Sequence, residues 1–144
     1  MGTWEFVSAE TVAPDGKKSP TFGMNPKGIV IFEATGHSAL IVTRSDAPKF
    51  ASNNRATGPP EENKETVVGN ISTFGDYMVN SDGSINLEIV GSSFPNWDDT
   101  KQKHLVEIKD DEMKWTDPKA STGGRAVITL QRAKSGDGYP QREK

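Results

Sequence analysis

The amino-acid sequence predicts an all-β protein, an eight-stranded antiparallel up-and-down β-barrel with one short helix near residues 60–68. Three observations lead to this prediction. Short runs rich in β-branched and aromatic residues recur along most of the chain. Turn residues separate most neighbouring runs by hairpin spacing, and only one segment carries a helix-start signal. Sequential hairpins favour a barrel over a sandwich, which more often requires Greek-key crossovers and leaves open edges.

The expected strands follow one another in chain order. In the first strand, successive side chains are expected to point to opposite faces of the sheet. Trp4, Phe6 and Ser8 then lie on one face and the intervening residues on the other. Three hairpins follow, with turns at residues 34–36, 80–84 and 110–111. The eight strands are expected at residues 3–12, 28–32, 39–42, 74–79, 85–90, 104–108, 113–116 and 126–130.

Prolines and acidic residues mark the start of the expected helix. Pro59 and Pro60 precede Glu61 and Glu62, and both residue types are favoured in the first turn of a helix. We expect this helix to lie across one end of the barrel.

The length of 144 residues is enough for one domain with one core. We assign residues 1–133 to the barrel domain. The last segment, residues 134–144, mixes glycine and proline with charged residues, and we expect it to be a disordered tail.

Composition excludes several classes of partner. The net charge of −3 comes without a basic stripe, which argues against nucleic acid. No apolar run approaches the roughly 18 residues of a membrane-spanning helix, so we expect no membrane insertion. The absence of cysteine favours a reducing cytoplasm, and with only two histidines we expect neither a metal site nor a cofactor. Monomer and homodimer both remain open.

Short motifs near both ends and in the middle of the chain resemble a known family. Gly2-Thr3-Trp4 resembles the Gly-x-Trp signature of lipocalins, and that resemblance implies that Trp4 closes the barrel base with Arg132 packed over its ring. Residues 50–55, 60–62 and 94–97 are similar to the bacterial and fungal lipocalin-like domain family, and the resemblance extends from Gly2 to Arg132. It implies a container for a small hydrophobic molecule. Some barrels of this type are cofactor-free cyclases or isomerases in natural-product pathways.

The chain also departs from the family pattern. Asp99 stands where a glycine is expected, His104 where relatives carry arginine, and Ser38 where a large aromatic is common. A small Ser38 would enlarge the pocket if it points inward.

Three residues are candidates for catalysis. His104 lies in a β-rich run, and an imidazole can transfer a proton near neutral pH. Arg55, in the long loop, could hold an enolate or carboxylate oxygen. Tyr77 lies in mid-strand, where an inward hydroxyl needs a partner; a core tyrosine bonded to a neighbour is the alternative.

Other residues are candidates for ligand binding, and each has a structural alternative. Asn53 and Asn54 either form a lid or satisfy their own loop. Trp97 either caps the barrel or stacks on a planar ligand. Glu88 faces water unless a bulge near Val90 reverses the strand's phase. The full set of ligand-binding candidates is Ser38, Arg44, Phe50, Asn53, Asn54, Glu88, Phe94 and Trp97.

Three functions fit these residues. The chain could be a cofactor-free isomerase or cyclase, a non-catalytic binder of a small apolar molecule, or a barrel filled by its own side chains. No nucleophile elbow, phosphate loop or carboxylate pair appears in the sequence. The polar candidates favour the enzyme slightly over the carrier.

Overall fold

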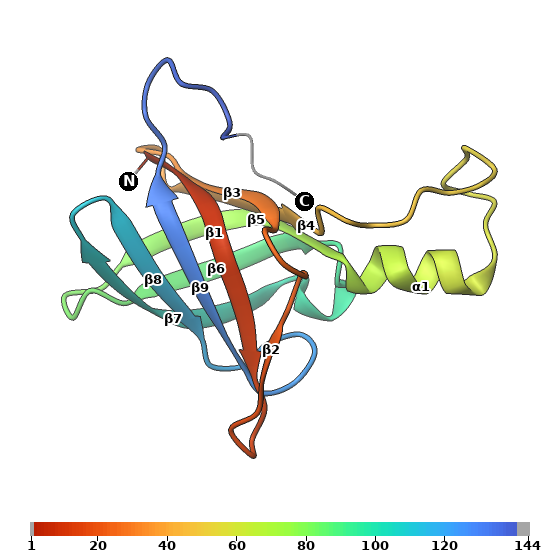
Figure 1. Cartoon of the computed structure of the whole chain (residues 1–144). Helices are drawn as coiled ribbons and strands as arrows, with labels where there is room; N and C mark the ends of the chain where they lie inside the picture. The colour runs from red at the N-terminus through yellow and green to blue at the C-terminus, as the bar shows by residue number, and fades with distance from the viewer. Residues whose placement is uncertain (1, 141–144) are drawn as a thin grey trace.

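The computed structural model describes residues 2–140 as a barrel with one projecting helix (Figure 1). In chain order the elements are β1 (Gly2–Val12), β2 (Lys18–Pro20), β3 (Lys27–Phe32), β4 (His37–Thr43), α1 (Pro60–Val68), β5 (Asn70–Val79), β6 (Ile85–Ser92), the short 3₁₀ helix η1 (Pro95–Trp97), β7 (Thr100–Lys109), β8 (Glu112–Asp117) and β9 (Arg125–Arg132).

Eight of the strands close into an antiparallel up-and-down barrel, which confirms the predicted fold class. Their order is β1-β3-β4-β5-β6-β7-β8-β9, and β9 pairs back with β1. The short β2 is an addition that the sequence did not predict. It pairs with the end of β1 at residues 10–12, beyond the point where β3 stops pairing at Glu5.

A bulge in β1 changes which side chains face the core. The pairing of β1 with β9 shifts register between Phe6 and Ser8. Trp4 and Phe6 are buried as expected, but Ser8 is exposed and Ala9 is buried. The prediction that Ser8 shares the face of Trp4 is therefore wrong, because one extra residue reverses the alternation of a strand.

Side chains of β6 alternate regularly between the core and the outside from Ile85 to Ile89. Ile85, Leu87 and Ile89 are buried, whereas Glu88 faces outward, 3.1 Å from the Lys101 ammonium. The pairing with β5 skips Val90, so the bulge lies after Glu88 and leaves its orientation unchanged.

The α1 helix forms where the prolines and acidic residues predicted it. It buries no residue, and Figure 1 shows it extending away from the barrel. The prediction that it lies across the barrel end is wrong. Its sequence explains this, because only Val67 and Val68 near its C-terminus are apolar, and a helix without an apolar stripe has no face to bury.

One end of the barrel is closed by packed aromatic rings. Trp4 is fully buried, and the Arg132 guanidinium carbon lies 4.3 Å from the centroid of its ring. Phe32 stacks on Trp115 at 5.7 Å between centroids and meets Tyr77 edge-on at 5.0 Å. Any interior space must therefore lie toward the opposite end.

The segment after β9 returns to the barrel wall. Gly28 lies just beyond the last β1–β3 pair, so its backbone groups on that side lack a strand partner. The Tyr139 hydroxyl accepts the Gly28 N–H at 2.8 Å and donates to the Gly28 carbonyl at 3.3 Å. Disorder of residues 134–144 stays a prediction, and its part at 141–144 lies outside the described residues.

Candidate functional site

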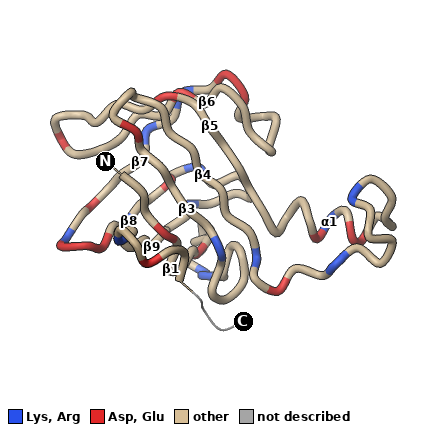
Figure 2. Tube along the Cα trace, turned by 90° about the horizontal axis from the view of Figure 1, so that it is seen from above, with Lys and Arg blue, Asp and Glu red and all other residues tan. Residues whose placement is uncertain are grey.

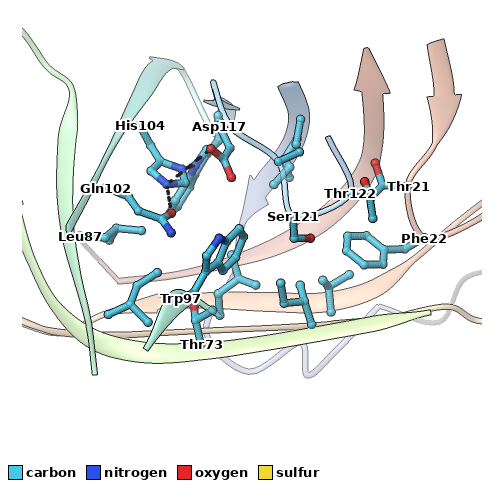
Figure 3. Close-up of a pocket in the computed structure, with 18 of the residues that line it drawn as sticks. Thr21, Phe22, Thr73, Leu87, Trp97, Gln102, His104, Asp117, Ser121 and Thr122 are labelled. Carbon is cyan, nitrogen blue, oxygen red and sulfur yellow. Dashed lines mark hydrogen bonds and ion pairs between the residues drawn. The ribbon is translucent and has the colours of Figure 1, made fainter. Parts of the chain in front are cut away.

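A buried histidine lies at the inner end of a cavity in the barrel. His104, on β7, is 5% exposed. Its Nδ1 accepts a hydrogen bond from the Trp115 indole N–H, and its Nε2 lies 2.8 Å from Gln102 Oε1 (Figure 3). An indole nitrogen can only donate, so Nδ1 must be the acceptor and Nε2 carries the proton. The network therefore fixes His104 as a neutral Nε2–H donor.

An aspartate completes this polar cluster. Asp117 ends β8 and is 7% exposed; its Oδ1 accepts the Lys119 N–H at 2.9 Å and lies 4.0 Å from His104 Nε2. Burial lowers the pKa of His104 to about 4, and burial also raises the pKa of Asp117. Both shifts have the same cause, because a site poor in water disfavours the charged form of either group.

The hairpin that joins β7 to β8 brings these side chains together. Leu105 pairs with Thr116, so His104 and Asp117 fall opposite each other one position further along. Gln102 shares the inward face of β7 with His104, since the two are separated by one residue. Trp115 likewise shares the inward face of β8 with Asp117.

The cavity beside the cluster is narrow and mostly apolar. About 60 Å³ is open to the centre of a water-sized molecule. The apolar wall comes from strands all around the barrel, and Thr73 adds a hydroxyl from β5. The described lining residues include no lysine or arginine, so Asp117 is the one side chain among them that is ordinarily charged at neutral pH.

A second hollow of about 240 Å³ adjoins the cavity at the barrel mouth. Phe22 lines both spaces, and Figure 3 shows it among the mouth residues, on the opposite side of the cavity from His104. The other residues common to the two hollows are Thr21, Ile71, Ser121 and Thr122. The outer hollow extends to Val67, Val68 and Phe94.

The structure brings three of the sequence-predicted site residues to these spaces. His104 and Trp97 line the inner cavity, and Phe94 lines the outer hollow. Phe94 and Trp97 also meet edge-on, with ring centroids 5.6 Å apart.

Two polar candidates, one within a barrel strand and one just after the end of β4, have partners away from the cavity. The Tyr77 hydroxyl donates to the Glu33 carbonyl at 2.8 Å. Arg44 contacts Asp46 at 3.0 Å and Glu65 at 3.9 Å. Ser38 pairs with the buried Phe32 near the closed end of the barrel and lines neither the inner cavity nor the outer hollow. Glu88 lines a hollow on the outer face of the sheet.

The loop before α1 does not reach the cavity either. Phe50, Asn53, Asn54 and Arg55 lie in the segment that projects with the helix (Figure 1). Its backbone is satisfied locally, for example by Ala56 N–H donating to the Asn54 side chain at 3.0 Å. Asn53 adopts a left-handed backbone with φ of +54°, which asparagine tolerates.

Sequence reasoning did not find Asp117, Gln102 or Phe22, which lines both hollows. Asp117 could have been predicted from the sequence. Residues 104 and 117 lie at equal distances from the Asp110-Asp111 turn, so they must face each other across a regular hairpin. Phe22 gave no signal, since it lies in a glycine- and proline-rich connection that joins strands rather than in a strand.

Charged and metal-binding residues in the described part of the chain are spread over the molecule. Figure 2 shows acidic and basic positions spread along the strands and turns of the barrel and along the projecting segment. Within residues 2–140, no group of three or more histidine, aspartate or glutamate side chains is placed to hold a metal ion. No helix in the same range is long and apolar enough to cross a membrane.

A closed antiparallel barrel with an apolar interior cavity and a few inward polar groups defines a small-molecule-binding barrel. The chain belongs to the lipocalin-like domain family, whose model matches residues 1–133. A comparison with curated proteins finds no match.

Proposed function

We propose that this protein binds a small, predominantly apolar molecule inside the barrel and holds one oxygen of that molecule at the His104–Gln102–Asp117 cluster. The observation that carries the proposal is a buried N–H donor, His104 Nε2–H, at the inner end of a cavity whose remaining wall is largely apolar. In the structure this N–H donates to Gln102 Oε1, and a ligand oxygen would take the place of that acceptor. Such a donor orients a ligand, while burial of hydrocarbon supplies the affinity.

The proposal is tested by titrating the protein with 1-octanol and following tryptophan fluorescence, because Trp97 and Trp115 line the cavity. We expect a saturable change. Thr73→Phe, which fills the cavity from β5, should abolish it, whereas Thr43→Phe on the outer face of β4 should not. A response that never saturates, or that is equal in both variants, would rule out binding in the barrel.

A second candidate function is cofactor-free isomerisation or cyclisation of the bound metabolite in natural-product metabolism. The specific observation in its favour is the 4.0 Å separation of Asp117 Oδ1 and His104 Nε2 inside an apolar cavity. Asp117 would take a proton from the carbon beside a ligand carbonyl while His104 donates a hydrogen bond to the carbonyl oxygen. Returning the proton to another carbon completes an isomerisation without net change in atoms or electrons.

Proton exchange separates the two candidates. With 2-decanone in D₂O, an isomerase should catalyse deuterium incorporation beside the carbonyl, and Asp117→Asn should abolish this incorporation without abolishing binding. Saturable binding of 2-decanone without exchange above the buffer rate would leave a non-catalytic carrier as the function.

We further propose a cytoplasmic location, which the cysteine-free sequence supports, and a monomeric or homodimeric state. Cell fractionation and light scattering test the two proposals directly. Recovery in the secreted fraction, or a larger assembly, would overturn them.

A further inference from the structure

We infer that the ligand is an elongated, uncharged molecule whose single oxygen meets His104 while its hydrocarbon chain runs past Phe22 to the mouth beside Val67 and Val68. This inference rests on the proposed function and specifies the ligand of the same site. It draws on the shape of the two hollows, the position of Phe22 and the charges that line the cavity.

The inner cavity alone is too small for most organic ligands. Its volume of about 60 Å³ is well below the roughly 150 Å³ of a protein cavity that accepts benzene. The outer hollow of about 240 Å³ shares part of its wall with the cavity. A ligand that reaches His104 must therefore extend through both spaces, which favours a long and narrow molecule.

Phe22 carries the largest side chain among the five residues that line both spaces. It is 8% exposed and lines both. It lies between β2 and β3, in a connection outside the barrel ladder, and Gly23 beside it has φ of +70°. Rotation of the Phe22 ring would thus break no strand pairing of the barrel and would widen the shared wall between the inner cavity and the mouth.

The mouth offers apolar surface where the chain of such a ligand would emerge. Val67 and Val68 are 71% and 47% exposed at the end of an otherwise polar helix. Both line the outer hollow together with Phe94. A hydrocarbon chain in this hollow would cover apolar side chains that the barrel itself leaves open to water.

The charges in the cavity select against an anionic head group. A carboxylate placed at His104 Nε2 would lie close to Asp117, and the described lining residues supply no lysine or arginine to compensate. Arg44 is already paired with Asp46 and Glu65. A ketone or alcohol oxygen needs only to replace Gln102 Oε1 as the acceptor of the His104 Nε2–H, whose position the Trp115 contact fixes.

Two probes of equal chain length test the charge selection, namely 2-decanone and decanoate, each titrated calorimetrically at pH 8. We expect the ketone to bind at least about tenfold more tightly, as a buried unpaired charge requires. Asp117→Asn should strengthen decanoate binding and reduce the ratio of the two dissociation constants to about threefold or less. Asp99→Asn is the matched control and should behave as the wild type. Asp99 is exposed and lies outside the cavity lining, and asparagine tolerates its positive φ.

Chain length tests the path through the mouth. Val68→Asp should weaken 2-decanone about tenfold and leave the shorter 2-pentanone unchanged. Thr66→Asp, exposed on the same helix but outside the hollow, should affect neither probe.

Decanoate binding as tight as the ketone would overturn the charge selection, and equal effects of Val68→Asp on both ketones would overturn the path. Failure of both ketones and of 1-octanol to bind saturably would instead refute the proposed function itself.

Discussion

Burial of His104 makes a quantitative prediction about stability at low pH. The unfolded chain protonates this imidazole near pH 6.5, whereas burial lowers the folded-state pKa to about 4. Acid therefore protonates the unfolded state first. Stability is unaffected above pH 6.5, falls as the pH drops through the interval between the two values, and levels off below pH 4.

The size of the effect follows from the two pKa values. At about 1.36 kcal/mol per pH unit, the full loss is about 3 kcal/mol, a large share of the stability of a small domain. Protonation at Nδ1 would also turn that atom into a donor facing the Trp115 N–H, which requires the contact to break.

Urea unfolding at a series of pH values, followed by tryptophan fluorescence, measures this loss. His104→Gln is the control, because glutamine can still accept the indole N–H but does not titrate. The raised pKa of Asp117, caused by burial, acts in the opposite direction, since its folded form resists ionisation as the pH rises above 3.8. Because Asp117 lies 4.0 Å from His104, the same pair of proteins is also compared in the Asp117→Asn background, which removes its contribution. If His104→Gln lost stability over the same interval by the same amount, the buried-imidazole explanation would be wrong.

Three further predictions concern the closure of the barrel by Arg132, the contact of the C-terminal segment with the barrel, and the contribution of α1 to stability. Replacing Arg132 with alanine removes the cation from the face of Trp4 and should lower the free energy of unfolding by about 1 kcal/mol; an unchanged urea midpoint would mean that the contact contributes nothing. Tyr139→Phe leaves the Gly28 N–H without its partner, so we expect a loss of about 1 kcal/mol and faster hydrogen exchange of that amide, whereas unaltered exchange would contradict a docked tail. Lys64→Gly should reduce helical circular dichroism without moving the tryptophan unfolding midpoint, because α1 buries no residue; a clear shift of the midpoint would show that the helix and barrel unfold together.

Local sequence signals were sufficient for most of the elements. Alternation placed Ile85, Leu87 and Ile89 in the core, and the Asp110-Asp111 turn positioned β7 against β8. These features depend on neighbours within one strand or hairpin. Local signals fail where an extra residue is inserted, as at the bulge after Phe6, because the sequence does not mark which residue leaves the pairing.

The candidate site was predictable only in part. His104 was identified from its place in a β-rich run, and it lies in the cavity. Arg55 was grouped with it because a long loop can fold over a barrel mouth, but the helix that follows has no apolar face, and the whole segment extends outward. Nothing in the loop itself reveals this, since its position depends on what the helix can pack against.

The sequence by itself determined a closed barrel of hairpins, because strand alternation and turn chemistry act over a few residues. Only the tertiary structure decided what the barrel contains. Strand register determines the contact of Trp115 with His104 and the approach of Asp117. The position of the β2–β3 connection at the barrel mouth places Phe22 in the wall shared by the two hollows. Those are relations between segments far apart in space or in sequence, and they fix the protonation state of His104 and the shape of the cavity that it faces.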